Sequence, residues 1–401
     1  MTRRAYILQA ISLVLIALLA VPDAKLEFGH HGLTWIYILV LSTSIAFFLT
    51  PVVHHAARRL GAVDHPGGRK AHAQPTPLMG GAAIYLGFAL VMVLGRDILH
   101  FSVELKGVAL GATLVFVMGI LDDIWGLSAK VRLIAQALAV GILVKYGVIV
   151  SFLPDAWWGN AGEILFTAFW VIGITNALNF LDGLDGLATG SSLINASFFA
   201  LAALQTSQPF MMLLATAMVG SCLGFLPFNF RRVKPASVFL GDGGSNFLGF
   251  TLAGIGILGD WGQDSVVGLA VPILILGVPI FDTTLTTIVR IRTGQVRTFG
   301  EWIRFTGRDH FHHRLSDLGI GNKKAVWVIY LVSVWLGLSA LVLKDARGID
   351  AIFSLLQTAI VFVLIGSFMV FVQNRYARLM EATRANRSQL PLPLEEKGQR
   401  R

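Results

Sequence analysis

The 401-residue chain is 55% hydrophobic and only 14% charged, with a mean hydropathy of +0.70. A soluble globular protein carries roughly 25% charged residues, so this composition excludes an ordinary soluble domain and indicates an integral membrane protein. The lone cysteine, Cys222, excludes a disulfide framework and a cysteine-based metal cluster. The net charge of +9 would suggest nucleic acid in a soluble protein, but membrane topology explains it here, so no nucleic-acid partner is expected.

Long apolar runs predict an all-α, polytopic transmembrane helical bundle in a lipid bilayer. A bilayer core of about 30 Å needs around 20 apolar residues per helix, and helices satisfy their own backbone polar groups in lipid. The N-terminal run to Val21 is interpreted as a retained span rather than a signal peptide, because Pro22 and Asp23 leave a poor cleavage region. About 11–12 spans are expected, and twelve segments qualify: 5–22, 33–51, 79–95, 107–121, 130–150, 163–180, 187–204, 209–227, 245–259, 265–288, 324–343 and 351–373.

The basic residues between these segments give the orientation. With the N-terminus inside, all but six of the 32 Lys and Arg residues fall on the cytoplasmic side, whereas the 23 acidic residues divide almost evenly. Chemistry on soluble molecules is therefore expected at the cytoplasmic face. The chain divides into N-terminal spans (1–51), a transmembrane core with cytoplasmic active-site loops (52–345), a last span (346–373) and a basic, disordered cytoplasmic tail (374–401).

The first polar cluster is the pair Asp122 and Asp123, which closes the fourth predicted span. Adjacent carboxylates at a membrane edge repel each other and are costly to desolvate unless a cation or base lies nearby. A solvated helix end is the alternative, although acids at a helix C-terminus oppose its macrodipole. Taken alone, the pair leaves a catalytic and a structural role equally open.

The second cluster contains two asparagines and two aspartates at three-residue spacing. Asn176, Asn179, Asp182 and Asp185 therefore share one face of a helix end, and a glycine after each aspartate lets the backbone turn. A calcium-binding loop is excluded, because its spacing and its bidentate glutamate are missing. A plain polar turn is disfavoured by four such side chains within ten residues.

The third cluster is the glycine-rich segment Gly241–Ser245, which runs into the ninth predicted span. Successive glycines before a helix expose backbone N–H groups that can cradle phosphate oxygens. Asp242 is placed to hold a Mg²⁺ ion that bridges to these phosphates. Because glycine-rich turns are common, the prediction depends on the aspartate within the turn.

The fourth cluster, Arg308–Arg314, contains three histidines in the large inner loop. Histidine and arginine donate to oxyanions, so the cluster suits a diphosphate. Three histidines also suffice for zinc, but the flanking Arg308 and Arg314 favour an anion over a bare dication. A solvated basic loop held by anionic lipid is the remaining alternative.

Two further groups give weaker predictions. The loop 64–72 is basic, and its Lys70 and His72 are candidates either for surface attraction to headgroups or for a phosphate contact. Asp282 lies inside the tenth predicted span, where an ionisable group is a functional candidate unless it pairs with a neighbouring cation.

Together these clusters indicate Mg²⁺-assisted phosphoryl transfer at a membrane edge, with a lipid as one substrate. A transporter or flippase is the alternative from a different class. It is disfavoured because the polar clusters lie at one edge and the chain shows no internal repeat.

Four motifs resemble those of the polyprenyl-phosphate N-acetylhexosamine-1-phosphate transferases of glycosyltransferase family 4. They occur in the family's order within about residues 50–345, and they are Leu121-Asp-Asp, Asn179-Phe-Leu-Asp-Gly-Leu-Asp-Gly-Leu, Val238-Phe-Leu-Gly-Asp-Gly-Gly-Ser and His310-Phe-His-His. Members of this family transfer a sugar 1-phosphate from a UDP-sugar to undecaprenyl phosphate on the cytoplasmic face, release UMP and need Mg²⁺. The resemblance implies the same activity here, in a bacterial cytoplasmic (inner) membrane and at the start of cell-envelope polysaccharide synthesis.

The histidine motif and the loop 64–72 are similar to the branch that starts O-antigen, enterobacterial common antigen or teichoic acid linkage units, so UDP-GlcNAc is the default donor. Another N-acetylated sugar stays open, because related members use other sugars. The phospho-N-acetylmuramoyl-pentapeptide transferase branch is the alternative, but it typically shows a run of histidines and a different first loop. Mn²⁺ is expected to be able to substitute for Mg²⁺, and a homodimer is kept open as the assembly.

The resemblance also implies roles for single residues. The metal ligands would be Asn179 and Asp242, and the catalytic residues would be Asp122 and Asp123 at the lipid phosphate with Asp182 and Asp185 on the nucleotide and metal side. Phe239 would stack on the uracil. The other substrate-binding candidates are His310, His312, His313, Arg308, Arg314, Lys70, His72 and Asn176.

Two departures from the family pattern stand out. Many members have a third acid where this chain has Gly126, which weakens any mechanism that needs a third carboxylate there. The chain also has one more predicted N-terminal span than the usual eleven. Both direct attack by the lipid phosphate and a covalent intermediate on one aspartate of the pair stay open at this point.

Overall fold

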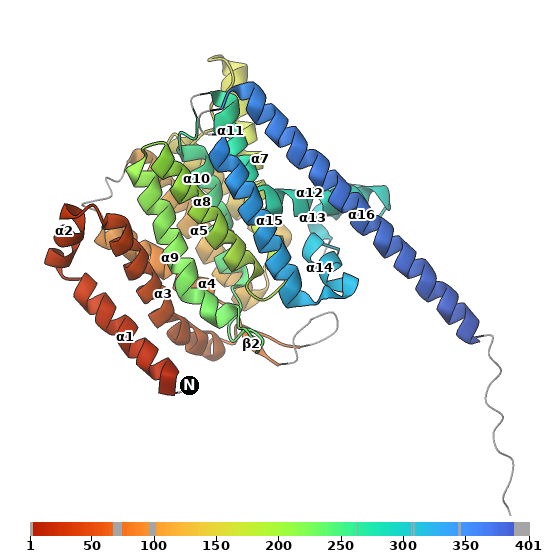
Figure 1. Ribbon diagram of the computed structural model, residues 1–401, viewed down its shortest axis with the longest axis horizontal. Coiled ribbons are helices and arrows are strands. Elements are labelled where there is room, and N and C mark those ends of the chain that lie inside the picture. Colours follow the sequence, from red (N-terminus) through yellow and green to blue (C-terminus); the bar gives the residue numbers. More distant parts are fainter. Residues whose placement is uncertain are drawn as a thin grey trace, which may run out of the picture.

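The computed structural model of this protein describes residues 3–66, 74–95, 102–262, 264–305, 307, 309–343 and 346–388. Within these ranges the chain is almost entirely helical, apart from a short antiparallel hairpin of β1 (Val63–Asp64) and β2 (Thr76–Pro77). Figure 1 shows the helices packed side by side in one bundle, with the C-terminal helix extending beyond it. The predicted fold class, a polytopic helical membrane bundle, is confirmed.

Each of the twelve predicted segments coincides with one helix or with a bent pair of helices. In chain order the helices are α1 (Arg3–Leu19), α2 (Pro22–His30), α3 (Thr34–Arg59), α4 (Gly81–Leu94), α5 (Val103–Trp125), α6 (Ala129–Lys145), α7 (Trp157–Leu181), α8 (Leu187–Gln205), α9 (Pro209–Asn229), α10 (Gly241–Leu258), α11 (Ser265–Ile275), α12 (Gly277–Arg292), α13 (Phe299–Arg304), α14 (Phe311–Leu315), the π-helical turn η1 (Ser316–Ile320), α15 (Asn322–Val342) and α16 (Gly348–Ser388).

Fewer helices qualify as complete spans than the twelve segments predicted. In the described part of the chain seven helices are long and apolar enough to cross a membrane, or nine if each of two bent pairs is one span. α4 has only 14 residues, α6 carries Lys130, Arg132 and Lys145, and α10 starts in the polar sequence Gly241–Ser245. The apolar stretch of each of these helices is therefore shorter than a full bilayer crossing.

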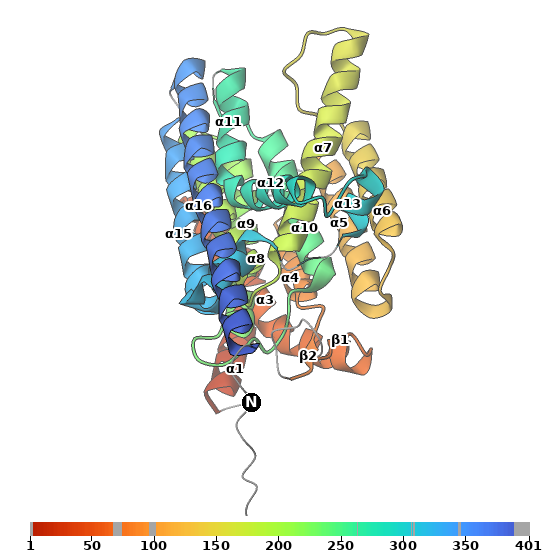
Figure 2. The same cartoon turned by 90° about the vertical axis from the view of Figure 1, so that its right-hand side faces the viewer.

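The predicted tenth span, 265–288, is broken in its middle. α11 and α12 meet at Leu276 with a bend of 77°. In a straight helix Pro279 could not donate to the carbonyl of Ile275, and its ring would clash with that carbonyl. α12 therefore lies across its neighbours rather than along them (Figure 2).

The C-terminal helix is longer than the last predicted span. α16 continues to Ser388, so residues 374–388 are helical where the sequence predicted a disordered tail. The sequence has no glycine or proline between Gly366 and Pro391, and alanine, arginine and leucine in this stretch favour a helix. Residues 389–401 lie outside the described part of the chain.

α10 lies at the centre of the bundle and contacts α4, α5, α7 and α8. Glycines let the neighbouring backbones approach it closely. A Cβ added at Gly81 of α4 would overlap Gly244, and one added at Gly119 of α5 would lie 2.5 Å from the carbonyl oxygen of Asp242. This small-residue packing, common between membrane helices, brings the polar start of α10 against α4 and α5.

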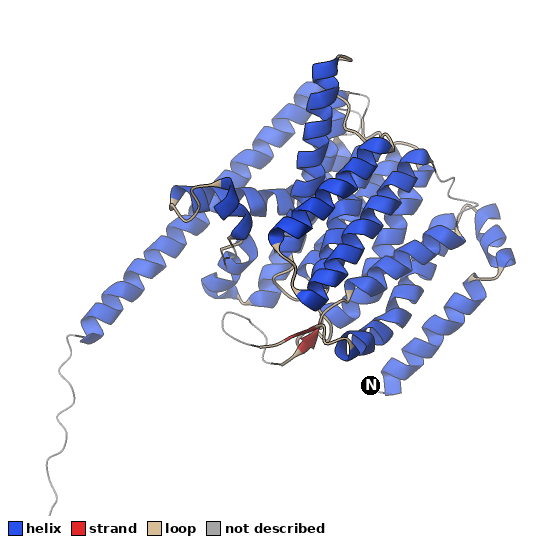
Figure 3. Cartoon of the chain, turned by 180° about the vertical axis from the view of Figure 1, so that it is seen from behind, coloured by secondary structure: helices blue, strands red, loops and turns tan. Residues whose placement is uncertain are grey.

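Several helix ends gather at one end of the bundle. α5 and α7 end there, and α8, α10 and α15 begin there, close to the β1–β2 hairpin (Figures 2 and 3). The predicted polar motifs lie at these helix ends. The fold therefore brings together segments that are far apart in the sequence.

Gly119→Ala is expected to destabilise the protein by about 1–3 kcal/mol, because the added methyl group would meet the backbone of α10. Thermal unfolding of the purified protein in detergent should show a lower midpoint. Gly141→Ala in α6 is the matched control, since nothing lies within 4 Å of a Cβ added there. An unchanged midpoint for Gly119→Ala would contradict the close packing of α5 on α10.

Candidate active site

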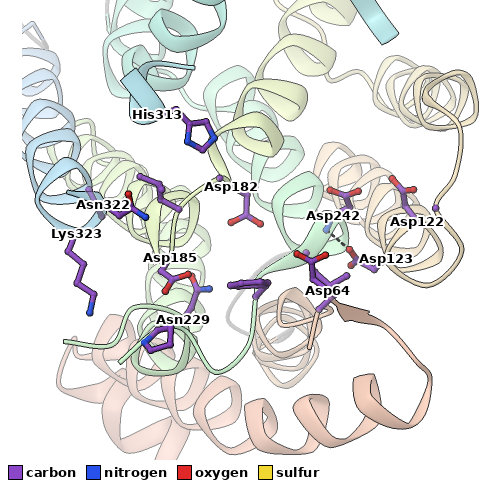
Figure 4. A pocket seen from close by; sticks show the side chains of 18 residues that line it. Asp64, Asp122, Asp123, Asp182, Asp185, Asn229, Asp242, His313, Asn322 and Lys323 are labelled. Atoms are coloured by element: carbon purple, nitrogen blue, oxygen red, sulfur yellow. Dashed lines mark hydrogen bonds between the residues drawn. The ribbon is translucent and has the colours of Figure 1, made fainter. Parts of the chain in front are cut away.

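A cavity of about 710 Å³ opens where these helix ends meet, and Figure 4 shows the side chains that surround it. Its lining includes six aspartates and one lysine, Lys323. So many carboxylates in one cavity repel each other unless cations or protons offset their charge. The aspartates are Asp64, Asp122, Asp123, Asp182, Asp185 and Asp242.

Asp123 binds the start of α10. One of its carboxylate oxygens accepts a hydrogen bond from the backbone N–H of Asp242 at 2.8 Å, and the other accepts one from Gly243 at 3.2 Å. Gly241 has a φ of +77°, and a Cβ there would lie 2.5 Å from the Asp123 carboxylate. The glycine turn thus exposes backbone N–H groups as predicted, but an aspartate of the chain occupies two of them.

Asp122 is held at a different point of the cavity wall. Its Oδ1 accepts a hydrogen bond from the backbone N–H of Leu127 at 2.5 Å, and its Oδ2 lies 3.2 Å from Arg132 Nη1. The same guanidinium nitrogen lies 3.6 Å from Asp242 Oδ2. Arg132, on the first turns of α6, therefore links two of the predicted site residues through its positive charge.

Asp242 is oriented by α7. Asn179 Nδ2 donates to Asp242 Oδ1 at 2.6 Å and to Ser245 Oγ at 2.9 Å. Asn179 holds the Asp242 carboxylate through this hydrogen bond but is not among the side chains that line the cavity. Its role as a metal ligand stays a prediction, with its amide oxygen as the coordinating atom.

Asn176 lies deeper in the bundle than the other predicted site residues. Its Nδ2 donates to Gln136 Oε1 at 2.8 Å, and Gln136 Nε2 donates to Asn246 Oδ1 at 3.1 Å. Asn246 Nδ2 in turn donates to the carbonyl of Asp242 at 2.7 Å. This amide network joins α6, α7 and α10 beneath the cavity. Asn176 is thus placed to support the site, and its predicted contact with substrate stays untested.

Asp182 follows the last residue of α7 and lines the cavity. Burial raises the pKa of its carboxyl group well above the ordinary value, and the nearby charges of Asp242 and Asp123 act in the same direction. A raised carboxyl pKa indicates that a bound proton, or a bound cation in its place, would be favourable.

Asp185 and Lys323 hold the loop between α9 and α10. Asp185 Oδ2 accepts a hydrogen bond from the backbone N–H of Ala236 at 2.7 Å. Lys323 Nζ donates to the carbonyls of Arg231 at 2.8 Å and Arg232 at 2.9 Å. The same loop carries Phe239, the predicted uracil contact, which lines the cavity as expected of such a residue.

The three histidines of the predicted diphosphate cluster face different environments. His313 lines the cavity, whereas His310 and His312 are buried beside Asp282 of α12. Arg314 is also buried, and its Nε donates to the carbonyl of Asp309 at 2.6 Å. The structure therefore brings one histidine of the motif, rather than the whole cluster, to the cavity.

Three of the predicted substrate-binding residues lie outside the described residues: Lys70, His72 and Arg308. Several cavity residues were not predicted from the sequence, among them Asn229, Asn322 and Lys323. Arg132 was also missed, although a cation in the first turns of a helix opposes the macrodipole and so signals a nearby acid. The sequence indicated for Lys323 only a place among the basic residues of the cytoplasmic loops.

Comparison with known proteins identifies the family. Residues 105–260 match the family model described as glycosyl transferase family 4. A probable undecaprenyl-phosphate N-acetylglucosaminyl 1-phosphate transferase of Bacillus subtilis is 38% identical over 312 residues, which cover 77% of this chain and 84% of that protein. The chain belongs to glycosyl transferase family 4. The family predicted from the four motifs is therefore confirmed, and the protein is a transferase.

Two further relatives of this family 4 protein cover most of its length. A decaprenyl-phosphate N-acetylglucosaminephosphotransferase of Mycolicibacterium smegmatis is 34% identical over 328 residues, or 74% of this chain and 78% of that protein. An undecaprenyl-phosphate alpha-N-acetylglucosaminyl 1-phosphate transferase of Escherichia coli K12 is 30% identical over 314 residues, which cover 75% of this chain and 80% of that protein. The family model covers the aspartate, asparagine and glycine motifs but ends before the histidine motif.

The side chains of this family 4 site fit a Mg²⁺ ion. The donors on offer are carboxylate oxygens, which hard divalent cations prefer. Among the described residues no three His, Cys, Asp or Glu side chains already surround one point. Mg²⁺ commonly takes one or two carboxylates and completes its shell with substrate phosphates and water, and the aspartates of the cavity can supply such carboxylates.

Binding of Mg²⁺ to the purified protein should strengthen as the pH rises above the ordinary range of a carboxyl pKa. The raised pKa of Asp182 means that protons compete for the carboxylates, so affinity should increase by up to about tenfold per pH unit for each proton displaced. Isothermal titration with Mg²⁺, or paramagnetic resonance with Mn²⁺, measures this dependence. Asp182→Asn should flatten the pH profile, and an affinity that is already independent of pH in the wild type would contradict the prediction.

Proposed function

We propose that this protein transfers N-acetylglucosamine 1-phosphate from UDP-GlcNAc to undecaprenyl phosphate and releases UMP. The observation that carries the proposal is the convergence of six aspartates in one cavity at the end of an apolar helical bundle. Such a cavity suits a metal-bound diphosphate, and its place at the helix ends suits a lipid acceptor. The names of the relatives in Bacillus subtilis and Escherichia coli support the same donor sugar and acceptor.

The proposed location is supported by the charge distribution of the chain. The excess of lysine and arginine in the inner loops supports a bacterial cytoplasmic membrane, with the cavity facing the cytoplasm. A nucleotide sugar is a soluble molecule, and undecaprenyl phosphate presents its headgroup at the membrane surface. Both substrates would meet at this face, and the product would start the synthesis of a cell-envelope polysaccharide.

The aspartates of the cavity would hold Mg²⁺, for which Mn²⁺ could substitute. Asp242 is the principal ligand in this proposal, and Asn179 orients its carboxylate. When bound there, the ion would neutralise charge on the diphosphate. The chain's own residues would place the donor: Phe239 would stack on the uracil, and His313 would donate a hydrogen bond to a phosphate oxygen.

The hydrogen bonds of the aspartate pair favour direct transfer over a covalent intermediate. Both oxygens of Asp123 accept backbone hydrogen bonds from α10, and Asp122 is bound by Leu127 and Arg132. These contacts hold both carboxylates in place and draw electron density from their oxygens, which disfavours attack by either one. In direct transfer an oxygen of the lipid phosphate forms a bond to the β-phosphorus, and the bond from that phosphorus to the bridging oxygen breaks. UMP leaves with the electron pair of that bond.

The lipid phosphate needs no strong base for this attack. The second pKa of a phosphate monoester is about 6, so the nucleophile is largely ionised near neutral pH. Arg132, which is partly exposed beside Asp122 and Asp242, is placed to offset the charge of an arriving phosphate. Positioning and charge neutralisation therefore supply most of the catalysis.

A panel of UDP-sugars offered to the purified protein with undecaprenyl phosphate and Mg²⁺ tests the proposed activity. UDP-GlcNAc should give a lipid-linked sugar and UMP, and UDP-MurNAc-pentapeptide should not. Asp242→Asn should lower kcat by about a hundredfold or more, since it removes a charge at the diphosphate. Asp260→Asn, an exposed aspartate beyond the other end of α10, is the matched control and should retain activity. If no UDP-sugar is consumed, the proposed function is wrong.

Isotope exchange separates the two chemical routes. Labelled UMP should not enter UDP-GlcNAc when the lipid acceptor is absent, because direct transfer forms no enzyme-bound sugar phosphate. Exchange should appear once undecaprenyl phosphate is added. Exchange without acceptor would instead support a covalent intermediate on Asp122 or Asp123.

A further inference from the structure

The short helix α14, which carries the histidine motif, is bound at its start by Asp282 of α12. Asp282 is fully buried, and its Oδ1 accepts a hydrogen bond from the backbone N–H of Phe311 at 2.5 Å. Its Oδ2 accepts a hydrogen bond from His310 Nδ1 at 3.0 Å. α14 has only five residues, and the side chain of its N-cap residue, His310, makes no capping hydrogen bond. The carboxylate of Asp282, which is distant in the sequence, caps the helix instead.

A second residue of α12 holds the preceding part of the loop. Arg290 donates from Nε and Nη2 to the two carboxylate oxygens of Asp309, both at 2.7 Å, and its guanidinium stacks 4.5 Å from the ring centroid of Phe305. Arg290 Nη2 also lies 3.5 Å from His310 Nε2. Because arginine only donates, Nε2 faces it as an acceptor, and the proton of His310 belongs on Nδ1, toward Asp282.

These contacts determine which histidine reaches the cavity. The ring of His312 packs against Gly183, where a Cβ would overlap its Nε2, and lies 4.2 Å from the ring of His313. His310 and His312 are thereby held against the bundle. His313 is left on the cavity side, and Figure 4 shows it at the edge of the opening near Asp182.

We propose that Asp282 is a positioning residue, which acts through His310 and the start of α14 to place His313 in the cavity. An ionisable side chain buried in a membrane bundle is costly, and both oxygens of Asp282 bind α14. This inference rests on the proposed function, in which His313 contacts the donor phosphates. Asp282 itself does not line the cavity.

A double-mutant cycle in kcat/KM tests whether Asp282 acts through His313. Asp282→Asn keeps the side-chain size and one oxygen that can accept from the Phe311 N–H. Its NH₂ group would then face the N–H at His310 Nδ1, and two donors cannot form a hydrogen bond with each other. We expect Asp282→Asn and His313→Ala each to lower kcat/KM for UDP-GlcNAc by about tenfold or more. The double variant should be no worse than the more damaged single variant. If the factors by which the two single substitutions lower kcat/KM multiply in the double variant, the inference is wrong.

Two further variants guard the cycle against a general defect of folding. His310→Asn approaches the same link from the other side and should behave as Asp282→Asn does. Thr286→Val, one turn along α12, is the matched control because Thr286 Oγ1 is buried and has no hydrogen-bond partner among the described residues. It should retain wild-type kcat/KM. The KM for undecaprenyl phosphate should not change in Asp282→Asn, and a loss confined to that KM would overturn the inference.

A measurement without substrate separates this inference from the proposed function. Hydrogen exchange of the segment 309–315, followed by mass spectrometry, should be faster in Asp282→Asn than in the wild type or Thr286→Val. Unchanged exchange would overturn the inference whatever the donor is. If the wild type does not consume UDP-GlcNAc, the proposed function is wrong. The hydrogen-exchange result for the segment 309–315 would still be valid in that case.

Discussion

The hydrogen bonds that Asp123 accepts from the start of α10 are the contact on which the active site depends. They join the end of α5 to the first turn of the central helix, and they satisfy two backbone N–H groups that a helix start leaves without a partner within the helix. Asp242 sits in that turn, so its carboxylate is fixed by the same contact. Gly119 lets the backbones of α5 and α10 approach closely, and Gly241 leaves room for the Asp123 carboxylate, so these bonds are geometrically feasible. An acid of the chain thus organises the turn before any phosphate arrives.

The consequence of this arrangement is a cavity with a large excess of carboxyl groups, which repel one another when ionised unless protons or cations bind there. Its aspartates come from four different parts of the sequence, and Lys323 already donates to loop carbonyls. Ionised carboxylates would repel a diphosphate, and a cation beside the diphosphate would offset this repulsion, so a divalent metal fits the site. The same excess disfavours a bare anion and favours a metal-bound nucleotide. The carboxyl groups of the cavity lining therefore favour a donor that binds together with a metal ion.

The sequence predicted the helical bundle, the family and the motifs, because hydropathy and local spacing carry that information. It did not reveal the depth or direction of individual side chains. Asn176 shares a helix face with Asp182, but six residues at 1.5 Å each place it about 9 Å further into the bundle, where Gln136 binds it. His310 and His312 lie buried beside Asp282, which is 28 residues before His310 in the sequence. Such long-range partners cannot be inferred from spacing alone. The bend beside Pro279 could not be predicted either, because membrane helices tolerate proline without breaking.

The break between α11 and α12 affects how charges are distributed through the thickness of the molecule. Asp282 and Arg290 are eight residues apart, which corresponds to about 12 Å along a helix axis. In an unbroken span along the bundle axis, those 12 Å would separate the two side chains in depth within the membrane. Asp282 and Arg290 could then not both reach the same short loop. Since α12 turns by 77°, the separation becomes largely lateral. Two consecutive loop residues, Asp309 and His310, can then each find a partner on the same helix.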